Sequence, residues 1–256
     1  MNETIDAAIV MGTYNRLPLL QACVESIRWS VGKLTYVCLV CDGGSNDGTR
    51  EWLVKQPDCE LLEGGMDGAV RAFNVGFSRA VDLEPECVGV LNDDDALPGH
   101  EHAISDAVAA IRADAEIGAV VFRSNLRGDW ACEACHANGQ FIYPNKGVIR
   151  LAAGMAAARA QGDPTGKDWW NPCYHTYGAD SEHGMWMWRL GWRCVPGGRV
   201  HDVRSTMPGL AHMDELRQRN KALYGDTGKV FVSRWGKLEQ CAYHREDAER
   251  FGGLLR

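Results

Sequence analysis

Three consecutive aspartates, Asp93-Asp94-Asp95, are the residues whose type and spacing point most directly to chemistry. They follow the apolar run 88–91 (VGVL), which is typical of a short buried strand. Three carboxylates at one strand end repel one another, and a cation or hydrogen-bond donors usually offset that repulsion. Their oxygen atoms suit Mg²⁺ or Mn²⁺, which would also contact phosphate. The alternative is a solvated acidic turn that caps the following helix.

Two further polar clusters follow apolar runs in the same way. Residues 7–12 (AAIVMG) lead into 13–16 (TYNR), and residues 36–41 (YVCLVC) lead into the turn 42–49 (DGGSNDGT). In a mainly parallel sheet, ligands bind at the carboxyl ends of the strands. The three clusters therefore predict one binding site, formed by the loops that follow these strands.

Strand-like and helix-like patterns alternate through the first half of the chain. The apolar runs are short enough for strands, and between them apolar residues recur at the spacing of one helix face. This alternation predicts an α/β fold with a mainly parallel sheet between helices. We expect strands at 7–12, 36–41, 59–62, 88–91 and 118–122, and helices at about 18–27, 47–53, 69–80 and 103–111.

The second half is less regular. Between 125 and 170 the periodicity fades, apart from a helical stretch near 148–160, and we expect loops packed over the sheet close to the site. No internal repeat and no Pro- or Ser-rich linker divides the chain. Further on we expect a helix at 180–190, a strand at 193–195, and helices at 211–223 and 237–251.

Four motifs of the first half occur in a set order: VMGTYNR (10–16), CDGGSNDGT (41–49), GAVRAFNVGFSRA (68–80) and LNDDDALPG (91–99). In this order and spacing they resemble the inverting family-2 glycosyltransferases of the GT-A fold. The resemblance covers about residues 7–99 with little need for gaps. Each motif is weak alone, but four in register are specific.

The second half resembles the same family. Its motifs YGADSE (177–182), GWRCV (191–195), RVH (199–201) and VFVSRWG (230–236) follow one another as the family's closing motifs do. One departure stands out, because Ala179 occupies the position of the usual first acid in Y-G-E-D. That leaves Asp180 as the match to the general base, with Glu182 as a neighbour that could replace it.

The resemblance implies a GT-A (Rossmann-like) α/β fold in one domain, 1–256. A nucleotide-sugar-binding half would span about 1–124. An acceptor-binding half with C-terminal helices would span about 125–256. The implied donor-binding residues are Thr13, Tyr14, Asn15, Arg16, Asp42, Arg71, Asn74, Asp93 and Asp94. The implied metal-contacting residues are Asp95 and His201, and the implied general base is Asp180.

The implied reaction is a single displacement. A Mn²⁺ or Mg²⁺ ion would neutralise the leaving nucleoside diphosphate of a UDP- or GDP-type sugar donor. An acceptor hydroxyl would attack the anomeric carbon from the opposite face while Asp180 removes its proton, which inverts the anomeric centre.

Several of these residues also have purely structural explanations. Asp42 could cap the turn after its strand, and Asp180 could cap the helix that follows it. Arg71 could be a solvated helix residue, and His201 an ordinary surface or core histidine. Asn15 and Arg16 could serve only to shape their loop.

Tryptophans concentrate on the presumed acceptor side. Trp169 and Trp170 stand in a polar loop, and aromatic rings stack on sugars or bases, so we predict that both bind the acceptor together with Glu182. For three further tryptophans we expect core packing: Trp186, Trp188 and Trp192.

Two alternative functions also involve binding of a nucleotide sugar. The acceptor could be a modified base of DNA or RNA instead of a carbohydrate or another hydroxyl compound. The chain could also be a binding module that holds the donor without turning it over, and Ala179 is the motive for that idea.

The ten cysteines favour reduced, mostly buried thiols, because no export signal is recognisable and the chain is long enough to build a core. Cys132 and Cys135 form a C-x-x-C pair that could bind structural Zn²⁺ together with Cys173 and His175. The spacing is not that of a standard zinc finger, so ordinary thiols explain the pair equally well.

The chain is acidic, with 27 Lys and Arg against 34 Asp and Glu and a formal net charge of −7. No basic block is present, which disfavours nucleic-acid binding by charge neutralisation. No apolar run is long enough to span a membrane, and the first residues do not form a secretion signal. From the sequence we expect a cytoplasmic location.

Overall fold

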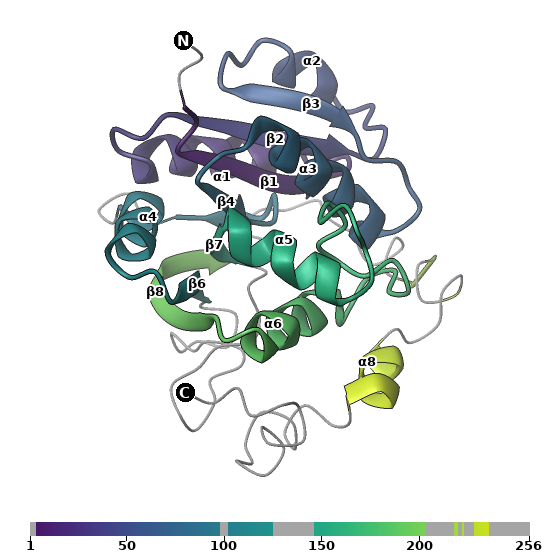
Figure 1. The fold of residues 1–256 in the computed structure, drawn as a ribbon. Helices are drawn as coiled ribbons and strands as arrows, with labels where there is room; N and C mark the ends of the chain where they lie inside the picture. Colours follow the sequence, from purple (N-terminus) through teal and green to yellow (C-terminus); the bar gives the residue numbers. More distant parts are fainter. Residues whose placement is uncertain are drawn as a thin grey trace.

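A computed structural model describes residues 4–97, 102–124, 146–202, 218, 219, 222 and 228–235. Its eight-stranded sheet has the order β3-β2-β1-β4-β7-β6-β8-β5 (Figure 1). The first four strands in this order are parallel, β7 runs antiparallel to both its neighbours, and β8 is parallel to β6. The strands are β1 (Ala7–Thr13), β2 (Tyr36–Asp42), β3 (Cys59–Glu63), β4 (Cys87–Val90), β5 (Asp95–Ala96), β6 (Ile117–Ser124), β7 (Gly147–Arg150) and β8 (Arg193–Asp202).

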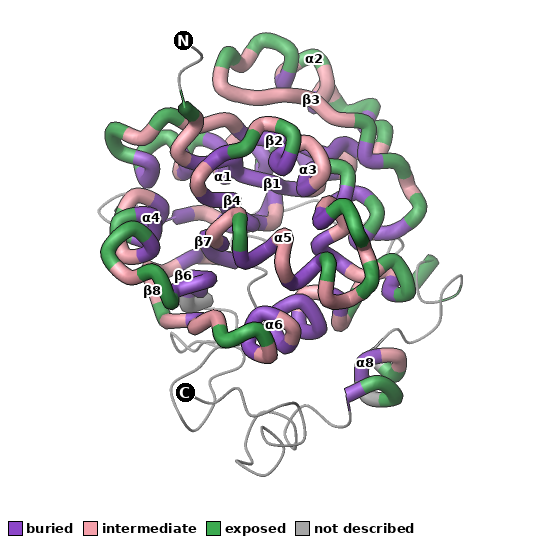
Figure 2. Tube along the Cα trace, viewed as in Figure 1, coloured by how far each residue is buried: buried purple, intermediate pink, exposed green. Residues whose placement is uncertain are grey.

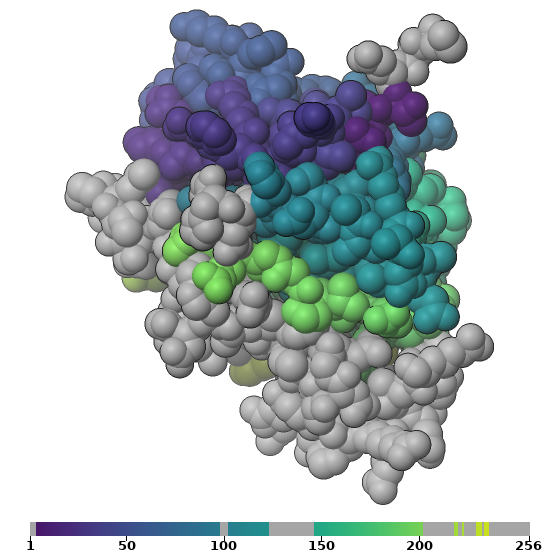
Figure 3. Space-filling view, turned by 90° about the vertical axis from the view of Figure 1, so that its left-hand side faces the viewer, coloured from purple at the N-terminus to yellow at the C-terminus, as the bar shows by residue number. Residues whose placement is uncertain are grey.

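Helices cover both faces of the sheet, as the alternating pattern predicts. One face carries α3, α5 and α6, and the other carries α1 and α4. From the side, α4 lies between α1 and β8 (Figure 3). The helices are α1 (Leu17–Ser30), α2 (Thr49–Leu53), α3 (Ala69–Leu83), α4 (Ala103–Ala113), α5 (Leu151–Ala160), α6 (Ala179–Arg189) and α8 (Gly228–Trp235).

Strand β1 shows how the sequence builds the two apolar layers. Successive side chains of a strand point to opposite faces. Ala8 and Val10 accordingly pack under α3, whereas Ile9 and Met11 pack under α1 and α4. Buried residues are concentrated in the central strands and in α6, and the outer side of α4 is exposed (Figure 2). A run that is apolar at every position is therefore buried on both faces.

Helix α3 lies unusually close to the sheet. A Cβ atom at Gly76 would come within 2.4 Å of a Val10 methyl group and 2.9 Å of the Cys41 sulfur. Only glycine allows this approach, and it brings the preceding turn of α3, with Phe73 and Asn74, up to the carboxyl end of β1.

The region around residue 148 differs from the sequence prediction. A helical stretch is expected from 148, but the structure forms β7 up to Arg150 and only then α5. Val148 packs in the layer under α1 and α4, and Ile149 in the opposite layer. So short an apolar run beside a helix carries no periodicity that separates strand from helix.

Other expectations fall partly outside the described residues. Of the predicted helix at 211–223, only residues 218, 219 and 222 are described, and the predicted helix at 237–251 lies outside them. Residues 228–235 form α8, which the sequence analysis did not recognise as a helix. No helix in the described ranges is both long and apolar enough to cross a membrane. The seven described cysteines are all unpaired, and five of them are buried.

Candidate active site

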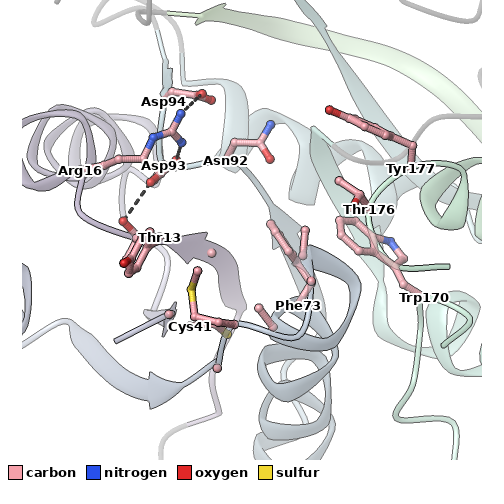
Figure 4. A pocket seen from close by; sticks show the side chains of 18 of the residues that line it. Thr13, Arg16, Cys41, Phe73, Asn92, Asp93, Asp94, Trp170, Thr176 and Tyr177 are labelled. Atoms are coloured by element: carbon pink, nitrogen blue, oxygen red, sulfur yellow. Dashed lines mark hydrogen bonds and ion pairs between the residues drawn. The ribbon is translucent and has the colours of Figure 1, made fainter. Parts of the chain in front are cut away.

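A cavity of about 340 Å³ opens where β1, β2 and β4 end (Figure 4). Its wall draws on the loops after these strands, on the start of α3, and on the segment leading into α6. The loops after all three strands reach this cavity, although the second polar cluster contributes only Gly43 to the wall. The lining residues include Gly12, Thr13, Tyr14, Arg16, Cys41, Gly43, Gly65, Met66, Gly68, Ala69, Ala72, Phe73, Asn92, Asp93, Asp94, Trp170, Thr176, Tyr177 and Asp180.

Arg16 holds the first two aspartates of the triplet. Its buried guanidinium pairs with the Asp93 carboxylate and, at 2.9 Å, with an oxygen of Asp94. The Thr13 hydroxyl donates a hydrogen bond of 2.9 Å to the other Asp93 oxygen. The loop after β1 therefore fixes both carboxylates in the cavity wall. The predicted donor-binding residues Thr13, Arg16, Asp93 and Asp94 form one connected network there.

The third aspartate points elsewhere. Asp95 begins β5, which pairs with β8, and its carboxylate is fully buried away from the cavity wall. Lys146, which immediately precedes β7, donates to it over 2.5 Å, and the Asn92 backbone N–H donates over 2.9 Å. This placement differs from the expected metal-contacting position, because a buried lysine already balances the Asp95 charge.

Burial dominates the electrostatics of the triplet. It raises the pKa of Asp93 to about 7, and the neighbouring Asp94 charge adds to that rise while Arg16 opposes it. Burial likewise raises the pKa of Asp95 to about 6, against the opposing effect of Lys146. Charge on these carboxyl groups is therefore costly, and the cation partners limit that cost.

The cavity wall offers two carboxylates to a hard divalent ion, and in this conformation both of them pair with Arg16. Magnesium is often held by one or two carboxylates together with substrate phosphates, and Asp93 and Asp94 offer two carboxylates there. Within the described residues, no three His, Cys, Asp or Glu side chains are placed to hold a metal by themselves. A divalent ion at this wall would therefore take its remaining ligands from a donor or from water.

Trp170 is one of the two predicted aromatic acceptor residues, and it lies in the cavity wall. Its ring packs against Phe73 of α3, with 4.4 Å between the ring centroids. Asn74 holds its backbone from the same helix. Asn74 Nδ2 donates to the Trp170 carbonyl over 2.6 Å, and the Trp170 N–H donates to Asn74 Oδ1 over 3.0 Å. Asn74, predicted to bind the donor, instead positions Trp170.

Asp180 lines the same cavity from the start of α6. It stands in the first turn of α6, directly after Ala179, which is buried in the apolar core. Gly178 precedes the helix with φ +96°, a left-handed conformation that glycine adopts readily. The sharp turn at Gly178 brings the chain into α6 so that Asp180 reaches the cavity.

Glu182 and Trp169 do not lie in the cavity wall, unlike the acceptor-side position predicted for them. The fully buried Glu182 carboxylate accepts hydrogen bonds from Asn171, Tyr174, Arg234 and Trp235. Burial alone would raise its pKa, but these donors hold the pKa of Glu182 below its usual value.

Trp169 is also fully buried, and its ring stacks between those of Phe77 and His183. Both Trp169 and Glu182 therefore serve the packing that surrounds the site. Trp188 is buried as expected, and Trp186 and Trp192 are partly buried against the same core.

Asp42 and Asn15 shape loops. The buried Asp42 carboxylate accepts hydrogen bonds from the Gly44 and Ser45 N–H groups, the Ser45 hydroxyl and Arg50. Asn15 adopts φ +51°, and its side chain accepts the Asn46 N–H. Neither residue lies in the cavity wall. In this conformation Asp42 caps the turn after its strand and Asn15 shapes its loop.

Arg71 and His201 also lie apart from the cavity wall. Arg71 is exposed on α3 and pairs with the exposed Asp67 one turn earlier. His201 belongs to β8, where it is the register partner of Ala96, next to Asp95. Its backbone therefore lies beside the end of the acid triplet.

Sequence reasoning missed three residues at or near the site: Tyr177, Met66 and Lys146. Tyr177 begins the YGADSE motif, which assigns no role to this residue, and it directly precedes the turn into α6. Met66 stands in the glycine-rich loop before α3 and lines the cavity. Lys146 has no local signal, because its partner Asp95 is distant in the sequence.

The predicted zinc site stays a prediction without support. Cys132 and Cys135 lie outside the described residues. Cys173 is exposed as a residue. Partial desolvation of its sulfur still raises the pKa of the thiol above its ordinary value. Thiolate is the form that binds zinc, so this shift does not favour a metal there.

Comparison with known proteins defines the class. A model of the family described as "Glycosyl transferase family 2" matches residues 8–146, which is more than half of the chain. The chain therefore belongs to glycosyltransferase family 2, whose members transfer sugars from nucleotide-sugar donors. No curated protein sequence matches significantly.

Solved structures share the fold. A mannosyltransferase, PcManGT from Pyrobaculum calidifontis, solved with GDP-Man and Mn²⁺, matches with a TM-score of 0.60 and 19% identity over 93% of this chain and 71% of its own. TarS from S. aureus, residues 1–349 with UDP, matches with a TM-score of 0.60 and 15% identity over 92% and 77% of the two chains. Its complex with UDP-GlcNAc matches with a TM-score of 0.57 and 14% identity, over 98% and 84%. These similarities establish the GT-A α/β fold, as predicted.

Proposed function

We propose that this enzyme transfers a sugar from a nucleoside-diphosphate donor to an acceptor hydroxyl, with inversion and with Asp180 as the general base. One observation carries the proposal: Asp180 and the Arg16-held aspartates, which come from opposite halves of the described chain, line the same cavity. That arrangement suits a donor held on one side and a proton acceptor on the other.

At the anomeric carbon the reaction breaks one bond and forms one. The acceptor oxygen bonds to the anomeric carbon, the bond from that carbon to the diphosphate oxygen breaks, and the nucleoside diphosphate leaves with the electron pair. Asp180 takes the proton of the acceptor hydroxyl, which makes the oxygen a better nucleophile. Attack opposite to the leaving group inverts the anomeric centre.

The cavity wall would hold the donor. Thr13 and Tyr14 lie on the side of β1 and β2, where the nucleoside belongs if this chain follows its family. Asp93 and Asp94 would hold a divalent ion, which supplies charge neutralisation for the diphosphate. PcManGT with GDP-Man and Mn²⁺ and TarS with UDP-GlcNAc support a UDP- or GDP-type donor and Mn²⁺.

The test compares two acid-to-amide variants. Asp180→Asn should abolish nucleoside-diphosphate release from the matching donor, while donor binding and the melting temperature stay unchanged. Asp106→Asn is the matched control, because Asp106 also stands in the first turn of a helix but is exposed on α4. Donor binding is followed by calorimetry with UDP- and GDP-sugars in the presence of Mn²⁺.

Full turnover in the Asp180→Asn enzyme would remove Asp180 as the base. Donor binding without turnover in the unmodified protein, with any acceptor, would identify a binding module instead.

A further inference from the structure

Tyr177 is the most exposed of the described aromatic residues in the cavity wall, where Tyr14 is only partly exposed. It lines the cavity, yet 61% of the residue is exposed, whereas Trp170 is only 7% exposed and Phe73 is buried. Figure 4 shows its hydroxyl directed across the cavity mouth toward Asn92, on the side away from Cys41. The ring therefore presents an accessible face at the end of the cavity remote from β2.

The backbone that carries this ring is fixed. A Cβ atom at the following Gly178 would lie 3.0 Å from the Tyr174 ring and 3.2 Å from Phe231. The Gly178 carbonyl accepts the Glu182 N–H over 2.9 Å, and the His175 carbonyl accepts the Val70 N–H over 3.3 Å. An exposed ring on a fixed backbone can bind a flat apolar surface with little loss of backbone freedom.

The charged residues of the cavity wall limit which acceptors could bind against the Tyr177 ring. Among the described residues in the cavity wall, the charged side chains are Arg16 and three carboxyl groups, those of Asp93, Asp94 and Asp180. Arg16 already pairs with two of these carboxylates. The proposed divalent ion would offset the negative charge of a donor diphosphate, but the wall keeps its excess of carboxylates over Arg16, so an anionic acceptor would meet repulsion here. A neutral, hydroxyl-rich acceptor would not.

We propose that Tyr177 is a specificity-determining residue that stacks on the ring of a neutral sugar acceptor. This inference rests on the proposed sugar transfer and adds the chemical class of the acceptor. The apolar C–H face of a pyranose packs on the phenol ring, and its hydroxyl groups face the carboxylates of the opposite wall. Asp180, three residues further along the chain, then lies beside the acceptor.

The experiment uses three variants of the full chain. Tyr177→Ala removes the ring, Tyr177→Phe keeps it, and Trp29→Ala is the matched control, because Trp29 is 65% exposed on α1 outside the cavity wall. The acceptor probes are the methyl glycosides of glucose, galactose, mannose and N-acetylglucosamine. The matching sugar 6-phosphates and an oligonucleotide containing 5-hydroxymethylcytosine are the anionic probes.

Two readouts separate this inference from the proposed function. Donor hydrolysis without acceptor reports whether the nucleotide sugar is used at all. Saturation-transfer NMR and product formation report acceptor binding. We expect a methyl glycoside to bind and accept sugar. In Tyr177→Ala its KM should rise about tenfold or more, a much larger change than that of the donor KM. Tyr177→Phe and Trp29→Ala should behave as the unmodified enzyme.

Three results would overturn the proposal while donor hydrolysis continues. They are an unchanged acceptor KM in Tyr177→Ala, preference for a sugar phosphate or the oligonucleotide, and failure of every methyl glycoside to bind. If the unmodified enzyme neither binds nor hydrolyses any donor, the proposed function itself is refuted.

Discussion

The side-chain amide of Asn74 forms two hydrogen bonds with the backbone of Trp170, donating to its carbonyl and accepting from its N–H. The two residues come from α3 and from the loop after α5, and both are buried. An amide is the side chain that can donate and accept at once in this geometry. The pair therefore joins α3 to the segment between α5 and α6 at the cavity wall.

Asn74→Ala should destabilise the protein by about 2 kcal/mol, because it leaves a buried N–H and a buried carbonyl without partners. Asn74→Asp should also destabilise it, since a carboxylate cannot donate to the Trp170 carbonyl. Urea denaturation measures both changes. Ser78→Ala, at a half-buried position one turn further along α3, is the control and should cost much less. Equal stability of Asn74→Ala and the unmodified protein would contradict the assigned role.

Arg16→Met should destabilise the fold by about 3–5 kcal/mol, because it leaves two buried carboxylates facing each other without their cation. Adding Asp93→Asn to Arg16→Met should recover part of that loss, since one uncompensated charge disappears. The measurement is the free energy of unfolding at pH 7.5. Additive losses in the double variant would show that the three groups do not form one network.

Glu182→Gln should lower the free energy of unfolding by about 2–4 kcal/mol, because it removes a buried charge that pairs with Arg234 and places an amide NH2 donor against groups that also donate. A catalytic base at this position would behave differently, giving a stable but inactive variant. Thermal denaturation and donor hydrolysis, measured on the same sample, distinguish the two roles.

His183 makes stability fall in acid. Burial lowers its pKa to about 4 in the folded protein, against an ordinary 6.5. Between these values the unfolded chain binds a proton that the folded chain refuses. The neutral histidine therefore contributes its full stability above pH 6.5, and this contribution is lost as the pH falls toward 4.

In His183→Leu the acid sensitivity should be smaller. Relative to the unmodified protein, this variant should gain about 2–3 kcal/mol between pH 7.5 and 4.5. Taking the difference between the two proteins cancels the contribution of the carboxyl groups to the pH dependence of stability. An unchanged difference across this pH range would show that His183 takes up its proton normally.

The sequence predicted most strands of the first half and the class of fold, because these depend on local apolar patterns and motif order, but it did not predict β5 or β7. It did not predict which aspartates of the triplet face the cavity. Asp95 turns away because Lys146, which is 51 positions later, reaches it in the folded chain. No local pattern records such a pair.

Helix α3 shows the same limit within one element. Arg71 and Asn74 are both polar residues in one motif, yet Arg71 is exposed and Asn74 is buried. Arg71 and Asn74 are neighbours on a helical wheel. Only the position of the Trp170 backbone in the folded chain shows that Asn74 is the buried one. Roles carried over from a motif therefore need the packing around each side chain.

The contacts of Glu182 give α8 an influence on the chemistry at a distance. Asp180 and Glu182 share the first turn of α6, and Glu182 is held by Arg234 and Trp235 of α8. These two residues lie well beyond the region that the family model matches. A displacement of α8 would therefore disturb the turn of α6 that carries Asp180, the proposed base.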